Sequence, residues 1–416
     1  PSLIVCPASL VYNWGQEFAR FSPEIRVLLI AGTAKERQEQ LEEQMRMEAS
    51  ERAQVIITSY DLLKRDRAAY LGRTFEYEII DEAQVIKNAK TQGAKAVKEI
   101  SANVRFALTG TPVENRLSEL WSIFDFLMPG YLPSYKSFCS RFEKPIVQEE
   151  DQTAVRRLNQ LTGPFILRRM KSDVLKELPP KTENVYRIEL EEEQRKLYLA
   201  AVVDAREKLQ AAKPEDKMAV FAVLMRLREI CCDPRLIADN WTGGSAKLDA
   251  CIELVTSAVE SGHRILLFSQ FTSMLELLAK RLDAEGVSHF TLQGSTPKPV
   301  RAELVRRFNG GEASVFLISL RAGGTGLNLT AADIVIHYDP WWNVAAQNQA
   351  TDRAYRIGQQ NPVQVYKLIA QDTIEEKIVE LQQAKQDLAE TVTGSADGAI
   401  LRMKPEELLN LLEGTE

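Results

Sequence analysis

Two adjacent carboxylates, Asp81 and Glu82, are the residues of this sequence best suited to carry chemistry. They follow a short apolar run, Tyr77 to Ile80, whose residue types favour a β-strand. In an open α/β sheet, ligands bind in the crevice at the carboxyl ends of the strands. One carboxylate there can hold Mg²⁺ through its water shell, and the next can orient or activate an attacking water. A solvated acidic pair at a strand end is the alternative interpretation.

A second polar cluster lies far along the chain, after the apolar run Val315 to Ile318. The glycines of Ser319 to Asn328 would let backbone N–H groups approach a phosphate. Further on, Arg353 and Arg356 are three residues apart, so a helix would place both guanidiniums on one face. Their planar forks match phosphate oxygens and could meet a nucleotide bound on the first half. An arginine-rich, solvated helix is the alternative interpretation.

Two series of strand-like runs alternate with helical stretches and must position these residues. The alternation predicts βαβ units and parallel sheets. The first series comprises Ser2–Cys6, Val27–Ile30, Val55–Ile57, Tyr77–Ile80 and Val104–Leu108, with a helix over residues 35–52. The second series comprises Ile265–Phe268, His289–Leu292, Val315–Ile318, Ile334–Tyr338 and Val363–Ile369, with helices over residues 272–284 and 300–308.

Helical patterns dominate between the two series, from Glu119 to about Cys232, and include residues 191–210 and 217–230. Basic residues gather there at Arg168, Arg169 and Lys171. We interpret this region as a helical insertion between two sheets, and a plain α-helical subdomain without a ligand is the alternative. Apolar residues also recur at helical spacing over 374–392, which predicts a helix packed on the body, with a functional apolar stripe as the alternative. The expected division is a first lobe over 1–118, an insertion and linker over 119–241, a second lobe over 242–372 and C-terminal brace helices over 373–416.

Composition limits the class of protein. The length of 416 residues favours two to three domains, and 45% hydrophobic residues are enough for packed cores. No apolar run reaches the ~18 residues that a membrane helix needs. A strand-like run begins at once, so we expect no signal peptide. The net charge of −6 gives no global signal for nucleic acid but leaves room for a local basic groove.

The cysteines indicate a reducing compartment. There are five, an odd number without regular spacing. Cys231 and Cys232 are adjacent, but no second pair or nearby histidine completes a metal site. We therefore expect buried or inert thiols.

In their residues and in their order along the chain, the polar blocks resemble the motifs of the SWI/SNF-type ATPases of helicase superfamily two. Residues 5–14 resemble motif Ia, 57–60 motif Ib, 81–84 motif II and 108–115 motif III. Residues 267–271 resemble motif IV, 319–329 motif V and 349–359 motif VI, while 166–171 and 227–234 resemble further family blocks. The match covers nearly the whole chain, and its combined order is specific although each motif alone is modest.

This resemblance implies an α/β fold with two RecA-like parallel-sheet lobes, ATP in the cleft between them and double-stranded DNA across both. Asp81 would position Mg²⁺, Glu82 would activate water and Gln84 would couple the site to the other lobe. Arg353 and Arg356 would be arginine fingers. The nucleotide contacts implied are Asp81, Glu82, Gln84, Gly326, Arg353 and Arg356.

The same resemblance implies contacts to the DNA backbone, which carry no base code. Thr109 and Thr111 would link the nucleotide state to the grip on DNA. The DNA path would be lined by Ser9, Thr58, Ser59, Ser269, Gln270, Gln293, Gly294, Ser319, Gly323 and Gly324.

The implied function is that of an ATP-dependent translocase on double-stranded DNA that remodels protein–DNA complexes. Its cofactors would be ATP and Mg²⁺, and its partners DNA with DNA-bound proteins or transcription machinery, without a membrane. The expected location is intracellular: the cytoplasm or nucleoid of a bacterium, or the nucleus of a eukaryote. A DNA-binding scaffold without ATP turnover and a strand-separating helicase are the alternatives.

One departure from the family pattern affects activity. The sequence contains no G-x-x-x-x-G-K followed by Ser or Thr, the loop that the family carries ahead of motif Ia. That loop supplies a lysine for the β- and γ-phosphates and a hydroxyl for Mg²⁺. We therefore expect a fragment that lacks an N-terminal segment and is inactive alone. The intact Asp81, Glu82 and two arginines argue against a naturally inactive relative.

Overall fold

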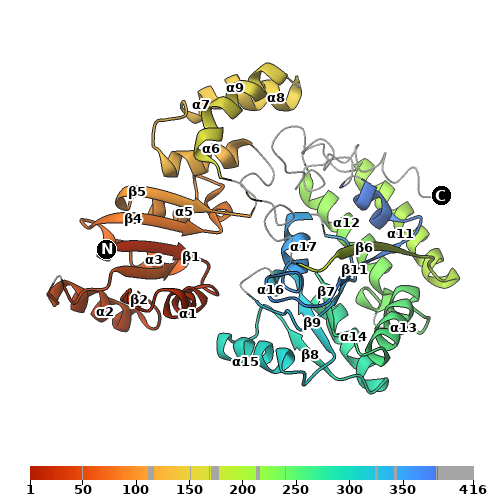
Figure 1. Cartoon of the computed structure of the whole chain (residues 1–416). Helices are drawn as coiled ribbons and strands as arrows, with labels where there is room; N and C mark the ends of the chain where they lie inside the picture. Colours follow the sequence, from red (N-terminus) through yellow and green to blue (C-terminus); the bar gives the residue numbers. More distant parts are fainter. Residues whose placement is uncertain are drawn as a thin grey trace. The chain divides into compact units, whose positions relative to one another are not determined.

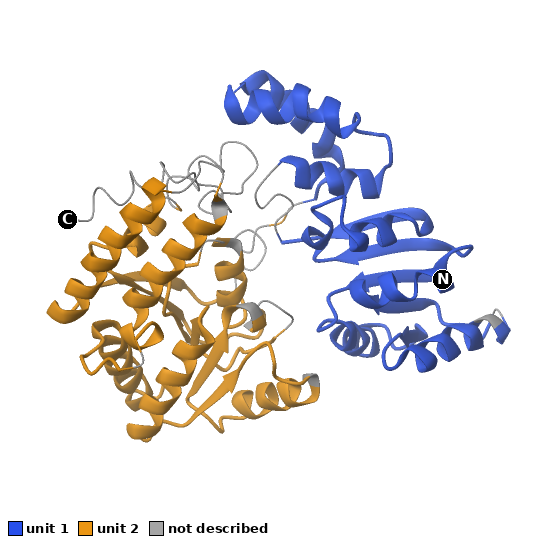
Figure 2. Ribbon diagram, turned by 180° about the vertical axis from the view of Figure 1, so that it is seen from behind, with its two compact units in different colours: residues 1–168, 389–395 blue, residues 169–388, 396–416 orange. Residues whose placement is uncertain are grey.

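The chain folds into two compact units, whose main parts are residues 1–168 and 169–388 (Figure 2). The computed structural model describes residues 1–48, 50–110, 117–149, 151–167, 169, 178–211, 216–238, 240–323, 327–341, 344–380 and 382. Each unit contains an all-parallel sheet with helices packed on it (Figure 1). The predicted fold class of two parallel-sheet α/β lobes is therefore confirmed.

The sheet of the first unit has the strand order β2-β3-β1-β4-β5. Its strands are β1 (Ser2–Cys6), β2 (Val27–Leu29), β3 (Val55–Ser59), β4 (Thr74–Asp81) and β5 (Ser101–Leu108). The helices between them are α1 (Val11–Phe21), α2 (Ala34–Arg46), α3 (Tyr60–Arg65), α4 (Arg67–Tyr70), the 3₁₀ turn η1 (Ala83–Ile86) and α5 (Gln92–Lys98). A helical extension follows, with α6 (Leu117–Leu127), α7 (Tyr135–Phe138), the π-helical η2 (Cys139–Glu143), α8 (Lys144–Gln148), α9 (Gln152–Thr162) and η3 (Gly163–Phe165).

Continuous apolar runs form the central strands of this sheet. Every residue of β3 is buried, as expected for a parallel strand covered on both faces. Helices α3, α5 and α6 contribute to the core on one face, and α1 covers β1 and β3 on the other. Local capping fixes the helix starts, because the Ser59 hydroxyl accepts the Leu62 N–H at α3.

One face of the strands β4 and β5 carries an open apolar strip in the described part of the chain. Tyr77, Val104, Phe106 and Leu108 remain 41–48% exposed. The register pairs Tyr77 with Val104 and Asp81 with Leu108, so the strip ends beside Asp81. Parallel sheets are normally covered on both faces, so this strip is unusual for a parallel sheet.

The opposite face of the same two strands holds a buried ion pair. Glu78 is fully buried, and burial raises its pKa to about 8 although Arg105 acts against this. The Arg105 guanidinium donates to Glu78 at 3.1 Å and to the backbone carbonyls of Phe126 (2.9 Å) and Ile100 (2.6 Å). Arg105 thus ties the edge strand to the helices beneath it.

We expect Arg105→Met to destabilise the first unit by about 1–3 kcal/mol, because it leaves a buried carboxyl group without its hydrogen-bond partner. Urea unfolding followed by circular dichroism measures the loss. Arg67→Met is the control, since Arg67 and Glu99 form an exposed ion pair that contributes at most about 1 kcal/mol. Equal losses in both variants would contradict a special role for the buried pair.

The sheet of the second unit has the order β6-β11-β10-β7-β9-β8. Its strands are β6 (Lys181–Ile188), β7 (Ile265–Ser269), β8 (His289–Leu292), β9 (Val315–Ser319), β10 (Ile334–His337) and β11 (Val363–Ala370). Its helices are α11 (Glu192–Ala211), α12 (Lys217–Cys232), η4 (Pro234–Leu236), α13 (Ala246–Glu260), α14 (Thr272–Ala284), α15 (Lys298–Asn309), α16 (Leu320–Gly323) and α17 (Val344–Thr351). Helices α13 and α14 pack on one face, and residues of α15 and α17 contribute to the core on the other.

The stretch 119–241 differs from the expected insertion in two respects. The two compact units divide it at residue 168, so α6 to α9 lie in the first unit and α11 and α12 in the second. It also contains a strand, β6, which pairs in parallel with β11 at the edge of the second sheet. Seven of its eight residues are exposed, so it lacks the apolar run that marks the central strands.

The start of the expected C-terminal brace is helical. Residues 374–380 form a helix, and Ile374 and Ile378 are buried in a cluster with α11 and α12. The predicted apolar positions Leu381, Leu388 and Val392 lie outside the described residues.

The predicted buried thiols are present in the second unit. Cys231 and Cys232 are both buried, and burial raises the pKa of each thiol above its usual value. Within the described ranges, no three His, Cys, Asp or Glu side chains are grouped closely enough to hold a metal ion. A helix long and apolar enough to cross a membrane is also absent from those ranges.

Candidate functional site

The two predicted carboxylates lie at the point where the first sheet reverses its strand order. From β1 the chain continues to β2 and β3 on one side, whereas β4 and β5 add on the other side. Asp81 is the last residue of β4, and Glu82 follows it directly. Ligands of α/β sheets bind at such switch points, outside the carboxyl ends of the strands. The topology therefore supports the predicted place of the site.

Two uncharged donors orient the Asp81 carboxylate. The indole Nε1 of Trp14, in α1, donates to Oδ2 at 2.9 Å, and the backbone N–H of Glu82 donates to Oδ1 at 2.9 Å. The Tyr60 hydroxyl, at the start of α3, donates to the Asp81 carbonyl at 2.8 Å. Burial raises the pKa of Tyr60, and the nearby Asp81 adds to this, so the hydroxyl remains a donor.

A line of hydrogen bonds continues from Glu82 to the end of β5. The side-chain amide of Gln84 donates to Glu82 Oε2, and Thr109 Oγ1 donates to Gln84 Oε1 at 2.9 Å. The sheet register produces this contact, because Asp81 pairs with Leu108 and Thr109 is the next residue. The motif II and motif III segments are thus joined through Gln84.

Glu82 has a strained backbone. Its φ of 53° lies in the left-handed region, which a residue with a side chain rarely adopts. Such a conformation costs on the order of 1–3 kcal/mol and is concentrated at functional sites. The turn directs the chain from β4 into η1 and brings Gln84 back to the Glu82 side chain.

The sequence did not predict that Trp14 and Tyr60 contact Asp81. Both lie in blocks that resemble motifs Ia and Ib, yet they contact Asp81 from 67 and 21 residues away. An aromatic donor near a strand end has no spacing pattern that would predict its acceptor. The signal available was their presence in those blocks.

The arginines of the second unit lie after a helix and not within one, so the condition for placing both guanidiniums on one helix face is not met. Helix α17 ends at Thr351, and residues 352–356 form turns and bends. The Arg353 carbonyl accepts the N–H of Leu329 at 3.0 Å, and Gly358 has a φ of +101°, which favours glycine. This tertiary hydrogen bond and the turn replace the helical pattern.

The arginine turn is fastened to the segment that follows the glycine-rich loop. Arg356 is exposed, and its Nη1 donates to the Leu327 carbonyl at 3.2 Å, whereas Arg353 is buried. The Gln359 amide donates to the carbonyls of Ala332 (2.7 Å) and Ala354 (3.1 Å). The blocks that resemble motifs V and VI therefore form one hydrogen-bonded body.

Three serines of the predicted DNA path are buried, and their hydroxyls have local partners. The Ser59 and Ser319 hydroxyls accept the N–H groups of Leu62 and Ala322, and Ser269 donates to Asp339 at 2.6 Å. These serines shape the strand ends and are not presented to solvent. Thr58 is also fully buried.

Other residues of the predicted path are at least partly exposed. Ser9, Gln270 and Gln293 are half-buried, and Gly294 is exposed. Gly323 ends α16. The remaining predicted residues lie outside the described residues: Thr111, Gly324, Gly326, Arg168 and Lys171.

Comparison with known proteins identifies the family. The SNF2-related domain matches residues 1–236, and the helicase conserved C-terminal domain matches residues 246–358. The chain is similar to the putative ATP-dependent helicase/translocase YwqA of Bacillus subtilis, with 39% identity over 99% of the chain and 45% of the relative. It is also 35% identical, over 99% of its length and 40% of the relative, to the mouse SWI/SNF-related matrix-associated actin-dependent regulator of chromatin subfamily A member 1.

A solved structure shows the same architecture. The Sulfolobus solfataricus SWI2/SNF2 ATPase core in complex with dsDNA is 34% identical, with a TM-score of 0.50 over all of this chain and 87% of that one. The chain spans less than half the length of the curated relatives that it matches. These matches confirm the resemblance predicted from the motifs: the chain belongs to the SNF2-related family, the SWI/SNF-type ATPases of helicase superfamily two.

Proposed function

We propose that the protein is an ATP-dependent translocase on double-stranded DNA that remodels protein–DNA complexes. The observation that carries the proposal is the line of hydrogen bonds from Thr109 through Gln84 to Glu82, with Asp81 beside it, at the switch point of the first sheet. It joins a carboxylate pair suited to phosphate chemistry to the segment that would sense DNA. The DNA-bound relative and the regulator of chromatin support the choice of partner.

The residues present fit Mg²⁺-ATP. Mg²⁺ prefers carboxylate oxygens and retains several waters. Both Asp81 oxygens accept bonds from uncharged donors, and within the described ranges no Lys or Arg pairs with this carboxylate. Its charge and its remaining lone pairs are available to a hydrated cation. When bound, Mg²⁺ would neutralise charge on the phosphates.

Glu82 would act on the attacking water. Its Oε2 is fixed by the Gln84 amide, and the left-handed backbone fixes its direction. A carboxylate so held can accept a proton from water as it attacks. Gln84 would pass changes at Thr109 to Glu82, so that DNA contact and hydrolysis depend on each other.

Arg353 and Arg356 would supply positive charge to the nucleotide phosphates. The turn that carries both arginines is held by hydrogen bonds from the Leu329 N–H and from the Gln359 amide. The positions of the two arginines are therefore fixed relative to the segment after the glycine-rich loop. Gln270, Gln293, Gly294 and Ser9 would meet the DNA backbone, and the buried serines would hold those segments in shape.

This chain alone is expected to show no robust DNA-stimulated ATP hydrolysis. Its sequence lacks the G-x-x-x-x-G-K loop that cradles the β- and γ-phosphates. Phosphate release at saturating duplex DNA is the measurement. Turnover that Glu82→Gln abolishes would contradict the expectation, since the residues present would then suffice.

Binding of duplex DNA by the chain is expected to be indifferent to sequence and to weaken steeply with salt. Contacts to phosphates release counterions, so the logarithm of the binding constant falls by about 0.9 per phosphate contact for each tenfold rise in salt concentration. Fluorescence anisotropy with two unrelated duplexes over a salt series measures both properties. A strong preference for one duplex, or an affinity independent of salt, would contradict the proposal.

A further inference from the structure

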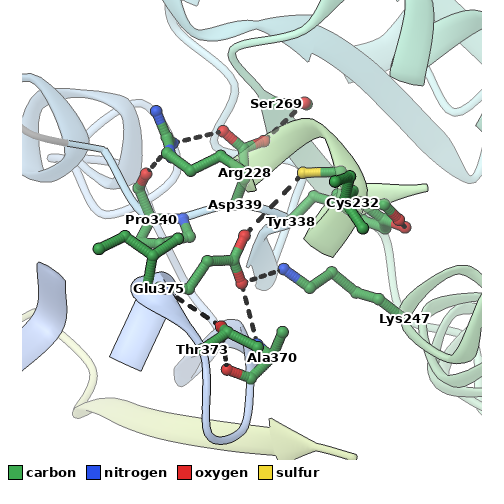
Figure 3. A network of polar contacts seen from close by, with 12 residues as sticks. Arg228, Cys232, Lys247, Ser269, Tyr338, Asp339, Pro340, Ala370, Thr373 and Glu375 are labelled. Carbon is green, nitrogen blue, oxygen red and sulfur yellow. Dashed lines mark hydrogen bonds and ion pairs between the residues drawn. The ribbon is translucent and has the colours of Figure 1, made fainter. Parts of the chain in front are cut away.

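Two buried ion pairs lie in the core of the second unit, one of them at the switch point of its sheet (Figure 3). The sheet reverses its order between β7 and β10, and Asp339 follows β10 by two residues. Asp339 pairs with Arg228 of α12, whereas Lys247 of α13 pairs with Glu375. All four side chains are at most 1% exposed. Replacing a buried pair by apolar residues often costs little stability, so such pairs call for another explanation.

Asp339 holds the corner where β7 ends. Its Oδ1 accepts the Ser269 hydroxyl at 2.6 Å and the backbone N–H of Gln270 at 3.2 Å. Its Oδ2 faces Arg228 Nη2 at 3.3 Å, and the same nitrogen donates to the Pro340 carbonyl. One carboxylate therefore connects the ends of β7 and β10 to helix α12 (Figure 3).

The second pair performs a different task. Glu375 Oε2 accepts from Lys247 Nζ and from the Ala370 N–H at 2.9 Å, at the exit of β11. In the described part of the chain, no hydrogen bond joins Lys247 or Glu375 to the β7 corner. This pair is equally buried and lies in the same core, so it is a matched control.

The side chain of Gln270 indicates a function for the corner at the end of β7. Its backbone N–H is fixed by Asp339, but its buried Nε2 has no hydrogen-bond partner among the described residues. A buried donor without an acceptor is rare and costs about 1–3 kcal/mol. An acceptor from outside the described residues is therefore expected, and an anionic oxygen suits an amide donor.

We propose that the buried Arg228–Asp339 pair is a positioning device that holds the Gln270 amide for a phosphate of duplex DNA. The inference rests on the proposed function as a DNA-binding motor and adds two residues to it, neither of which reaches DNA itself. Ser269 belongs to the same device, because its hydroxyl is one of the two links between Asp339 and the corner.

The test measures duplex binding by this chain with variants that neutralise each pair. Arg228→Met with Asp339→Leu is expected to weaken binding by about tenfold, the effect of one hydrogen bond to a charged group. The salt slope should not change, because an amide contact releases no counterion. Lys247→Met with Glu375→Leu should bind like the parent chain.

Gln270→Ala tests whether the Arg228/Asp339 pair affects duplex binding through the Gln270 amide. It should weaken binding as much as the Arg228/Asp339 double variant, and combining all three changes should weaken it no further. Additive losses, or unaltered binding in the double variant, would overturn the inference. If that double variant does not fold, Ser269→Ala is the deciding variant. It is expected to lower duplex affinity by less than Gln270→Ala does, and unaltered affinity would contradict the inference.

The parent chain separates the inference from the proposed function. If the parent binds duplex DNA and the variants bind equally well, the inference alone fails. If the parent chain does not bind duplex DNA at all, the proposed function fails and the inference with it.

Discussion

Replacing Arg356 by alanine is expected to lower the turnover number by about 10³- to 10⁵-fold, the range found for arginine fingers in phosphoryl transfer. The experiment uses an extended form of the protein, in which a strand and helix bearing a G-x-x-x-x-G-K-T loop precede Pro1. Arg356 is suited to the test because its side chain is exposed and donates only weakly, at 3.2 Å, to the Leu327 carbonyl. Its loss should therefore leave the second sheet folded.

Steady-state ATP hydrolysis and duplex affinity should be measured side by side. Arg356→Ala should reduce hydrolysis without weakening DNA binding to a similar degree. Arg353→Ala should behave alike, with its fold verified because Arg353 is buried. Arg306→Ala is the control, since Arg306 is an exposed residue of α15 and pairs with Glu303. Near-normal turnover in both arginine variants would mean that this turn is a structural surface.

Glu82→Gln in the extended form is expected to slow hydrolysis by about 10²- to 10⁴-fold, the contribution of a positioned general base. The amide retains the shape of the side chain but removes the carboxylate that accepts the proton. ATP should bind nearly normally, because Asp81 and its two donors are unchanged. Single-turnover hydrolysis and ATP affinity, measured in parallel, separate the two effects.

Asp81→Asn provides the complementary variant. It should weaken the handling of Mg²⁺-ATP itself, because the charge that faces the cation is lost. Gln38→Glu, on the exposed surface of α2, controls for a change of one charge. If Glu82→Gln turned over like its parent, the acidic pair would not be the catalytic centre.

Much of the fold could be predicted because its central strands are continuous apolar runs. The predicted strands at β1, β7, β8 and β9 agree with the structure to within one residue. Strand β6 was missed because it is an exposed edge strand, in which mostly polar residues leave no apolar pattern. The helical interpretation of the arginine segment failed because a tertiary bond from Leu329 outweighed local spacing.

Residues of the candidate site could be predicted only where they belong to a recognisable sequence motif. Asp81 and Glu82 follow a strand, and that position could be inferred from the run before them. The contacts of Trp14 with Asp81 and of Arg228 with Asp339 join residues 67 and 111 positions apart. No periodicity relates such residues, so only the folded sheet brings them together. The hydrogen-bond partner of Ser269 is likewise distant in sequence, because Asp339 follows another strand, β10.

The central claim is that ATP hydrolysis at Asp81 and Glu82 is coupled to duplex DNA. The open apolar strip on β4 and β5 offers a place for the added strand and helix of the extended form, next to Asp81. The most direct test is phosphate release by that form, with and without duplex DNA and Mg²⁺. Turnover should require both duplex DNA and Mg²⁺, and Glu82→Gln should abolish it. Hydrolysis that is equally fast without DNA, or that survives the loss of the Glu82 carboxylate, would contradict the central claim.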